Sequence, residues 1–205
     1  MDIIYKWLET SEDIVYYDFE TTGLNQYHDK IIEYAFFKES DKTEISGLID
    51  PEIPISMKIQ KITNITNEMV SGKPKMWQVL PKIISFLQEG PNNKYLVAHN
   101  NDGFDRIFLQ NQLKKYDYNC QSFDWKYIDT LLLAKKLLPN LSSYSLKALL
   151  IYFKLPPMNT HRALDDTKVL RLLYHELCKI LTKKINLSYE DIINSPSSVY
   201  KYLYC

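Results

Sequence analysis

The sequence predicts an α/β fold in which one mixed sheet carries helices on both faces. Three strand-like segments near the start of the chain are joined by short connections, which predicts an antiparallel meander. Beyond them, helical and strand-like segments alternate, as they do where parallel strands are linked through helices. The 205 residues fall within the size of one domain, and a hydrophobic content of 45% indicates a packed core.

The strands are expected at runs of β-branched and aromatic residues that end in turn-forming residues. They span residues 13–20, 31–39, 43–50, 94–99 and 125–129. The helices are expected where apolar residues recur every three or four positions. They span residues 62–70, 76–88, 104–115, 130–138, 144–153 and 163–183. The apolar face of helix 76–88 is expected to hold Trp77, Leu80, Ile84 and Leu87. These elements place a domain at residues 1–185 and leave 186–205 as a C-terminal appendage of unknown role.

Several classes of protein are excluded by the residue pattern. No apolar run approaches the roughly 20 residues that cross a bilayer. The first residues also lack the basic start and long apolar core of a signal peptide. Cys120, Cys178 and Cys205 are widely spaced and odd in number, which argues against a disulfide scaffold and a zinc finger. We therefore expect an intracellular protein, cytoplasmic or nuclear, that does not contact a membrane.

The charge of the chain is zero overall but unevenly distributed. Equal numbers of basic and acidic residues, 25 of each, argue against a protein that holds nucleic acid by net charge alone. Residues 1–110 carry 11 basic and 17 acidic residues, whereas residues 111–185 carry 13 and 6. An acidic half beside a basic half would suit metal ions on one side and a polyanion on the other. Scattered, solvated charge explains the same numbers equally well.

Two carboxylates share one face of the first strand. Side chains alternate along a strand, so Asp18 and Glu20 project to the same side, about 7 Å apart. At that separation both can reach one divalent cation. Buried carboxylates are rare unless they are paired or bound to a metal, so an apolar strand carrying two of them predicts a cation site. The alternative is that this face is exposed to solvent at the edge of the sheet.

Further candidates lie near the starts of two helices. Asp105 falls in the first turn of helix 104–115, where a lone acid is more often a capping residue that favours the helix dipole than a metal ligand. Asp166 is in phase with the apolar face of the last helix, whereas Asp165 turns about 100° away from it. His161 stands five positions before Asp166, in a loop where a surface histidine is the more ordinary outcome. A central sheet would bring the acids together, and two Mg²⁺ or Mn²⁺ ions roughly 4 Å apart can promote phosphodiester displacement.

Three motifs, taken in order, resemble those of the DEDD exonucleases, in the subgroup whose last motif contains histidine. They are DFETTGL (18–24), AHNNDGFD (98–105) and HRALDD (161–166). Supporting matches at 62–69, 128–139 and 144–153 extend the similarity over roughly residues 13–180. The resemblance implies a ribonuclease-H-like fold of three layers, with a mixed five-stranded sheet and an exonuclease domain at residues 1–185. The family that the sequence resembles includes the proofreading subunit of the bacterial replicative polymerase and stand-alone 3′–5′ exonucleases.

The resemblance also implies a role for each matched residue. The metal ligands, for two divalent ions (Mg²⁺ or Mn²⁺), would be Asp18, Glu20, Asp105 and Asp166. His161 would take a proton from the attacking water, a role that suits a neutral imidazole at physiological pH. The residues that grip the 3′-terminal nucleotide would be Thr21, Thr22 and Leu24.

The expected activity is metal-dependent hydrolysis of phosphodiester bonds at the 3′ end of single-stranded nucleic acid, DNA in the first instance, with release of nucleoside 5′-monophosphates. An exoribonuclease of the same fold is the nearest alternative, since nothing in the motifs reads a 2′-hydroxyl. A non-catalytic, polymerase-associated adaptor is a more distant one, supported only by the tail 186–205. Besides the nucleic acid 3′ end, a DNA polymerase or a second copy of the chain are the partners considered.

Overall fold

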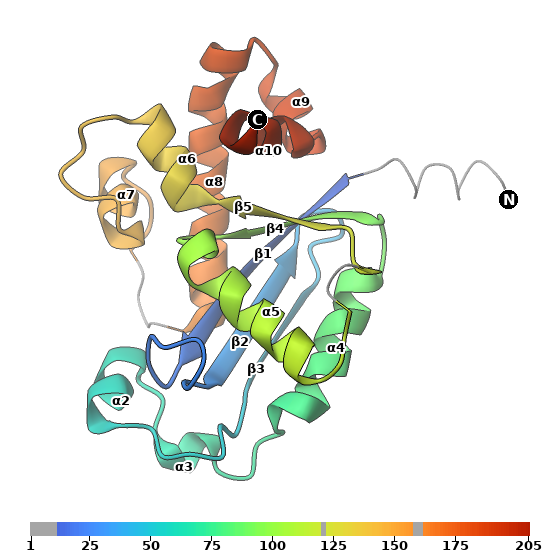
Figure 1. Ribbon diagram of the computed structural model, residues 1–205. Helices are drawn as coiled ribbons and strands as arrows, with labels where there is room; N and C mark the ends of the chain where they lie inside the picture. The colour runs from blue at the N-terminus through green and yellow to red at the C-terminus, as the bar shows by residue number, and fades with distance from the viewer. Residues whose placement is uncertain (1–11, 120–121, 158–161) are drawn as a thin grey trace, which may run out of the picture.

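The computed structural model describes residues 12–119, 122–157 and 162–205 (Figure 1). Its centre is one five-stranded sheet in the order β3-β2-β1-β4-β5. The strands are β1 (Glu12–Thr21), β2 (Ile31–Lys38), β3 (Glu44–Leu48), β4 (Asn93–Ala98) and β5 (Trp125–Asp129). The pairs β1–β2 and β2–β3 are antiparallel, whereas β1–β4 and β4–β5 are parallel. The predicted mixed sheet, with a meander followed by parallel strands, is confirmed.

Helices cover both faces of this sheet (Figure 1). They are α2 (Met57–Thr63), α3 (Asn67–Val70), α4 (Met76–Gln88), α5 (Asp105–Lys115), α6 (Thr130–Leu137), α7 (Leu146–Tyr152), α8 (Ala163–Ile185), α9 (Tyr189–Asn194) and α10 (Ser197–Tyr204). One core lies between the sheet and helices α4 and α5, and a second lies between the sheet and helices α6 to α10. The three layers therefore follow from a sheet whose two faces are both apolar.

Strand β1 is buried on both sides, which explains its nearly continuous apolar sequence. Ile14 and Tyr16 belong to the core under α8, while Val15, Tyr17 and Phe19 belong to the core under α4 and α5. The alternation expected for this strand is confirmed. Asp18 and Glu20 continue the side of Ile14 and Tyr16, so β1 directs both carboxylates toward α8.

Two helix predictions differ from the structure. The single helix expected at 62–70 is wrong, because the chain breaks at Asn64, whose φ of 57° is left-handed, a conformation that asparagine tolerates. Ser56 and Thr66 then each cap a short helix with their side chains. In α4, Trp77 is 55% exposed rather than buried. At 100° per residue it lies about 100° from the centre of the buried face, which is shared by Met76, Leu80, Ile83 and Leu87.

The C-terminal residues, for which the sequence shows no partner element, form α9, which contacts α8, and α10, which contacts β5 (Figure 1). Ile192, Val199 and Leu203 are buried in the same core as α8. The ammonium group of Lys136 donates to the backbone carbonyls of Tyr202 and Leu203, at 3.0 and 2.6 Å. The apolar face of this tail is therefore used within the chain. Among the described residues, no helix combines the length and the hydropathy needed to cross a membrane.

Candidate active site

Strand β1 and helix α8 bring three carboxylates together. Carboxylate oxygens of Asp18, Glu20 and Asp166 lie within 4.8 Å of one another. Asp166 reaches them because α8 packs along β1 with the face that also carries Val169 and Leu170. Its Oδ1 atom is buried and has no hydrogen-bond partner among the described residues. An unpartnered buried carboxylate oxygen beside two further carboxylates is the environment that a cation fits.

Asp105 approaches β1 from the opposite core. It is the first residue of α5, it is only 2% exposed, and its Oδ1 accepts a hydrogen bond of 3.1 Å from the backbone N–H of Phe19. Phe19 stands between Asp18 and Glu20 in the strand, so this bond holds the Asp105 carboxylate next to the other acids. The carboxylate of Asp105 is directed toward β1, although it lies outside the group of three defined above.

Burial raises the pKa values of all four acids, and neighbouring carboxylates add to the rise. Burial, followed by the charges of Asp105 and Glu20, raises the pKa of Asp18 well above its usual range. Burial and the charge of Asp166 raise the pKa of Glu20 to about 8. Burial also raises the pKa of Asp105 to about 8 and that of Asp166 to about 7. The cluster is therefore electrostatically unfavourable when fully ionised, and a divalent cation would offset this cost.

The loop before Asp105 is fixed by hydrogen bonds to neighbouring strands. The buried Asn101 side chain donates to the carbonyls of Leu96 and Ile128, both at 3.0 Å, and so joins the ends of β4 and β5. His99 is held between the Thr130 hydroxyl and the Tyr144 carbonyl, and burial lowers the pKa of this imidazole to about 4. These residues of the second motif thus support the loop that leads to α5.

Asp129 is a supporting residue that the sequence analysis missed. Its buried carboxylate accepts hydrogen bonds from the backbone N–H groups of Asn100 and Asp102, at 3.0 and 3.1 Å, and from Leu131 in the first turn of α6. One acid therefore caps α6 and positions the β4–α5 loop. The available signal was an aspartate placed between a strand and a helix.

Glu33 is a second missed residue. It lies in β2 opposite Glu20, is 3% exposed, and accepts hydrogen bonds from the Arg162 side chain and from the backbone N–H of Ala163. The only sign in the sequence that Glu33 has a special role is its position as a single acid within the apolar run IIEYAFF.

The turn after β1 presents Leu24 to solvent. Thr22 donates its hydroxyl to Asp29 at 2.9 Å and accepts from the backbone N–H of Lys30, which closes the loop. A Cβ atom at Gly23 would clash with the Asp29 carboxylate and displace it from its hydrogen bonds to Thr22 and Asn25. Thr21 is buried and donates to the Gly23 carbonyl. Leu24 is 81% exposed at the tip of this loop.

His161 lies outside the described residues. The first described residue after it is Arg162, and Asp165, which follows in α8, is exposed as expected.

Residues 15–174 match the RNase T family, which is described as Exonuclease. The chain belongs to this exonuclease family. Curated relatives include the PolC-type DNA polymerase III of Thermotoga petrophila, 40% identical over 171 residues that make up 81% of this chain, and that of Clostridium perfringens, 35% identical over 160 residues and 77% of this chain. The exonuclease chain spans only 12% and 10% of the lengths of these two polymerases.

Solved structures show the same fold. Exonuclease I of E. coli, in complex with a dA16 oligonucleotide, superposes with a TM-score of 0.71 at 16% identity, over 88% of this chain and 43% of that one. Exonuclease I of Methylocaldum szegediense gives a TM-score of 0.68 at 17% identity, over 88% of this chain and 42% of that one. The expected ribonuclease-H-like exonuclease fold is thus confirmed.

Proposed function

We propose that the chain is a metal-dependent 3′–5′ exonuclease of the histidine subgroup, which acts on single-stranded DNA and releases nucleoside 5′-monophosphates. The observation that carries the proposal is the group of Asp18, Glu20 and Asp166, with its unpartnered buried oxygen, in a chain of the exonuclease family. A purely structural role for these acids would leave their mutual repulsion without compensation.

The donor set fits hard divalent cations. All the side chains available are carboxylates, which suit Mg²⁺ and Mn²⁺ better than softer metals. Asp18, Glu20 and Asp166 would hold one ion, and Asp18 with Asp105 would hold a second. Such ions supply charge stabilisation to the attacking and leaving oxygens of a phosphodiester.

The remaining roles fall to residues around the acids. His161, five positions before Asp166, would accept the proton of the attacking water. Thr21 and Thr22 would form part of the binding site for the 3′-terminal nucleotide, and the exposed side chain of Leu24 would pack against its base. Packing of this kind requires an unpaired base, which favours single-stranded ends.

DNA is favoured as the substrate over RNA by the relatives. The curated relatives are named as DNA polymerases, and one structure with this fold is a complex of E. coli exonuclease I with single-stranded DNA. The likeness to polymerases also supports a proofreading setting with a polymerase as partner, and a second copy of the chain is the other partner considered. An exoribonuclease of the same fold is the alternative, because the three motifs do not discriminate between deoxyribose and ribose. A non-catalytic adaptor is disfavoured, because Asp18, Glu20, Asp105 and Asp166 are all present.

The test is cleavage of matched 5′-labelled single-stranded DNA and RNA with Mg²⁺, Mn²⁺ or EDTA. We expect a ladder that shortens from the 3′ end, requires metal, and is lost in Asp18→Ala. Asp165→Ala is the matched control, since Asp165 adjoins Asp166 but is exposed, and it should retain cleavage. Faster cleavage of RNA would select the exoribonuclease, and no cleavage of either substrate by the wild-type protein would refute the proposed activity.

A further inference from the structure

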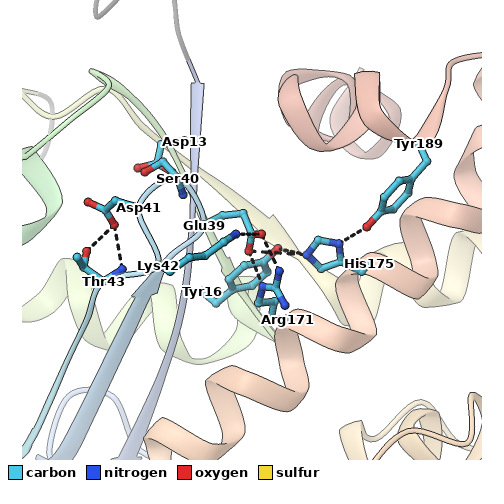
Figure 2. Close-up of polar contacts among 10 residues, drawn as sticks. All are labelled: Asp13, Tyr16, Glu39, Ser40, Asp41, Lys42, Thr43, Arg171, His175 and Tyr189. Carbon is cyan, nitrogen blue, oxygen red and sulfur yellow. Dashed lines mark hydrogen bonds and ion pairs between the residues drawn. The ribbon is translucent and has the colours of Figure 1, made fainter.

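Two glutamate–arginine ion pairs join the β2 segment to α8. The first, which we call the acid-end pair, is Glu33 with Arg162. The second, the far-end pair, is Glu39 with Arg171, in which the guanidinium donates to both carboxylate oxygens at 2.6 and 2.8 Å (Figure 2). The two arginines are nine residues apart, which corresponds to about 13.5 Å along a helix. The pairs therefore tie the same two parts of the fold at well-separated points.

The acid-end pair contacts the very start of α8. The Glu33 Oε1 atom accepts hydrogen bonds from Nε and Nη2 of Arg162, at 2.8 and 2.6 Å. Its Oε2 atom accepts a bond of 2.9 Å from the backbone N–H of Ala163, the first residue of the helix. The backbone N–H of Asp166 in turn donates to the Arg162 carbonyl at 3.0 Å. One turn of helix thus connects Glu33 to a member of the acid group.

The position of Glu33 is electrostatically unfavourable for the acid group. It is the cross-strand partner of Glu20 and lies almost completely buried. Burial is the main cause of the raised pKa values of Glu20 and Asp166, and the charge of Glu33 adds to the rise at both. The hydrogen bonds that its side chain makes with described residues go to Arg162, the N-cap of α8, and to Ala163, its first residue. The contacts therefore point to a role in holding the helix.

We propose that Glu33 is a positioning residue: through Arg162 and the N–H of Ala163 it holds the first turn of α8 where Asp166 completes a cation site with Asp18 and Glu20. The inference rests on the metal site of the proposed function. Mutation of a group that orients a metal ligand without touching the metal typically lowers the metal affinity by roughly 10- to 100-fold.

The test is Mn²⁺ affinity, measured by isothermal titration calorimetry on the full chain. We expect Glu33→Gln and Arg162→Gln each to weaken Mn²⁺ binding about tenfold. The double variant should bind no more weakly than the weaker single variant, because both changes break one connection. Arg162 is 40% exposed at its side chain, so its replacement perturbs the core little. The Mn²⁺ concentration for half-maximal cleavage of single-stranded DNA should rise in parallel with the dissociation constant.

Glu39→Gln is the matched control. It breaks an ion pair of the same type between the same parts of the fold, far from the acids, so it should lower the melting temperature while Mn²⁺ affinity stays within twofold. A tenfold loss of affinity in Glu39→Gln would show that general loosening of α8 explains the effect, and would overturn the inference.

If Glu33 acted on the acid group only through its charge, Arg162→Gln would change Mn²⁺ affinity in the opposite direction. Removing Arg162 would then leave an uncompensated negative charge and tighten Mn²⁺ binding, whereas positioning predicts weaker binding. Tighter or unchanged binding in Arg162→Gln would overturn the inference and leave the proposed function intact. Wild-type protein that binds no Mn²⁺ would overturn both.

Discussion

Replacement of Asp166 by asparagine should stabilise the metal-free protein at pH 8. Burial, with added contributions from the charges of Asp165 and Glu33, raises the pKa of Asp166 from 3.8 to about 7. This difference corresponds to about 4 kcal/mol, which is an upper limit to the cost of ionising Asp166 in the folded state. Asparagine has nearly the same shape and no charge, so Asp166→Asn removes that cost.

The sign of the effect fixes its pH dependence. The folded-state pKa of Asp166 lies above its unfolded value. The free-energy cost of ionising Asp166 in the folded protein is therefore absent below about pH 4, grows as the pH rises, and is complete above about pH 7. The free energies of unfolding of the variant and the wild-type protein should therefore converge toward pH 4. They should differ most at pH 8, in favour of the variant.

The assay is differential scanning calorimetry in EDTA at pH 5 and pH 8. For a chain of this size, a gain of 1 kcal/mol raises the melting temperature by about 2–4 °C, so even a quarter of the upper limit is measurable. Asp165→Asn is the control, since that carboxylate is exposed and its removal should change the melting temperature less. An Asp166→Asn variant that is no more stable than the wild-type protein at pH 8 without metal would contradict the raised pKa of Asp166.

Four other changes have defined outcomes. Adding Mg²⁺ at pH 8 should raise the melting temperature of the wild-type protein and leave that of Asp166→Asn nearly unchanged; a wild-type protein that does not respond would contradict the cation site. Leu24→Ala should raise KM for single-stranded DNA about tenfold in steady-state assays, by analogy with base-stacking contacts, at an unchanged melting temperature, since Leu24 is 81% exposed; an unchanged KM would count against base packing. His161→Ala should lower kcat by about 10²–10⁴-fold while DNA affinity in fluorescence anisotropy is retained, and equal losses of both would argue against a general base. Leu203→Ala should cost about 2–5 kcal/mol in urea unfolding, since Leu203 is buried in the core that also contains the apolar face of α8; no loss would mean that the tail does not contribute to the core.

The features that sequence alone predicted are those set by local periodicity. The period of two in β1 assigns Tyr16 and Asp18 to one face and Tyr17 to the other, and the period of 3.6 in α8 places Asp166 on the buried face and Asp165 outside it. In both elements the side of each residue follows from its position in the repeat. The mixed sheet then follows from the order of the elements.

The features that sequence could not predict depend on partners far away in the chain. Glu33 and Arg162 are separated by 129 positions, and neither residue carries a local sign of the other. The tail shows the same limit, because Leu203 is buried in a core that consists largely of residues far earlier in the chain. The break at Asn64 is different, since it is a local choice between one helix and two capped ones that a short repeat does not decide.

Packing of α8 against the sheet opposes the repulsion among the acids. Ionised Asp166 costs at most about 4 kcal/mol and would tend to push α8 away from β1. Leu170, Leu173 and Leu177 on the same helix are buried against the sheet, at 0–2% exposed. Burial contributes roughly 1.5–3 kcal/mol for each such side chain, which exceeds the repulsion when the three are taken together. Packing therefore favours the position of α8 that brings Asp166 to Asp18 and Glu20, and a cation bound there would add the relief of their repulsion to the stability of the folded state.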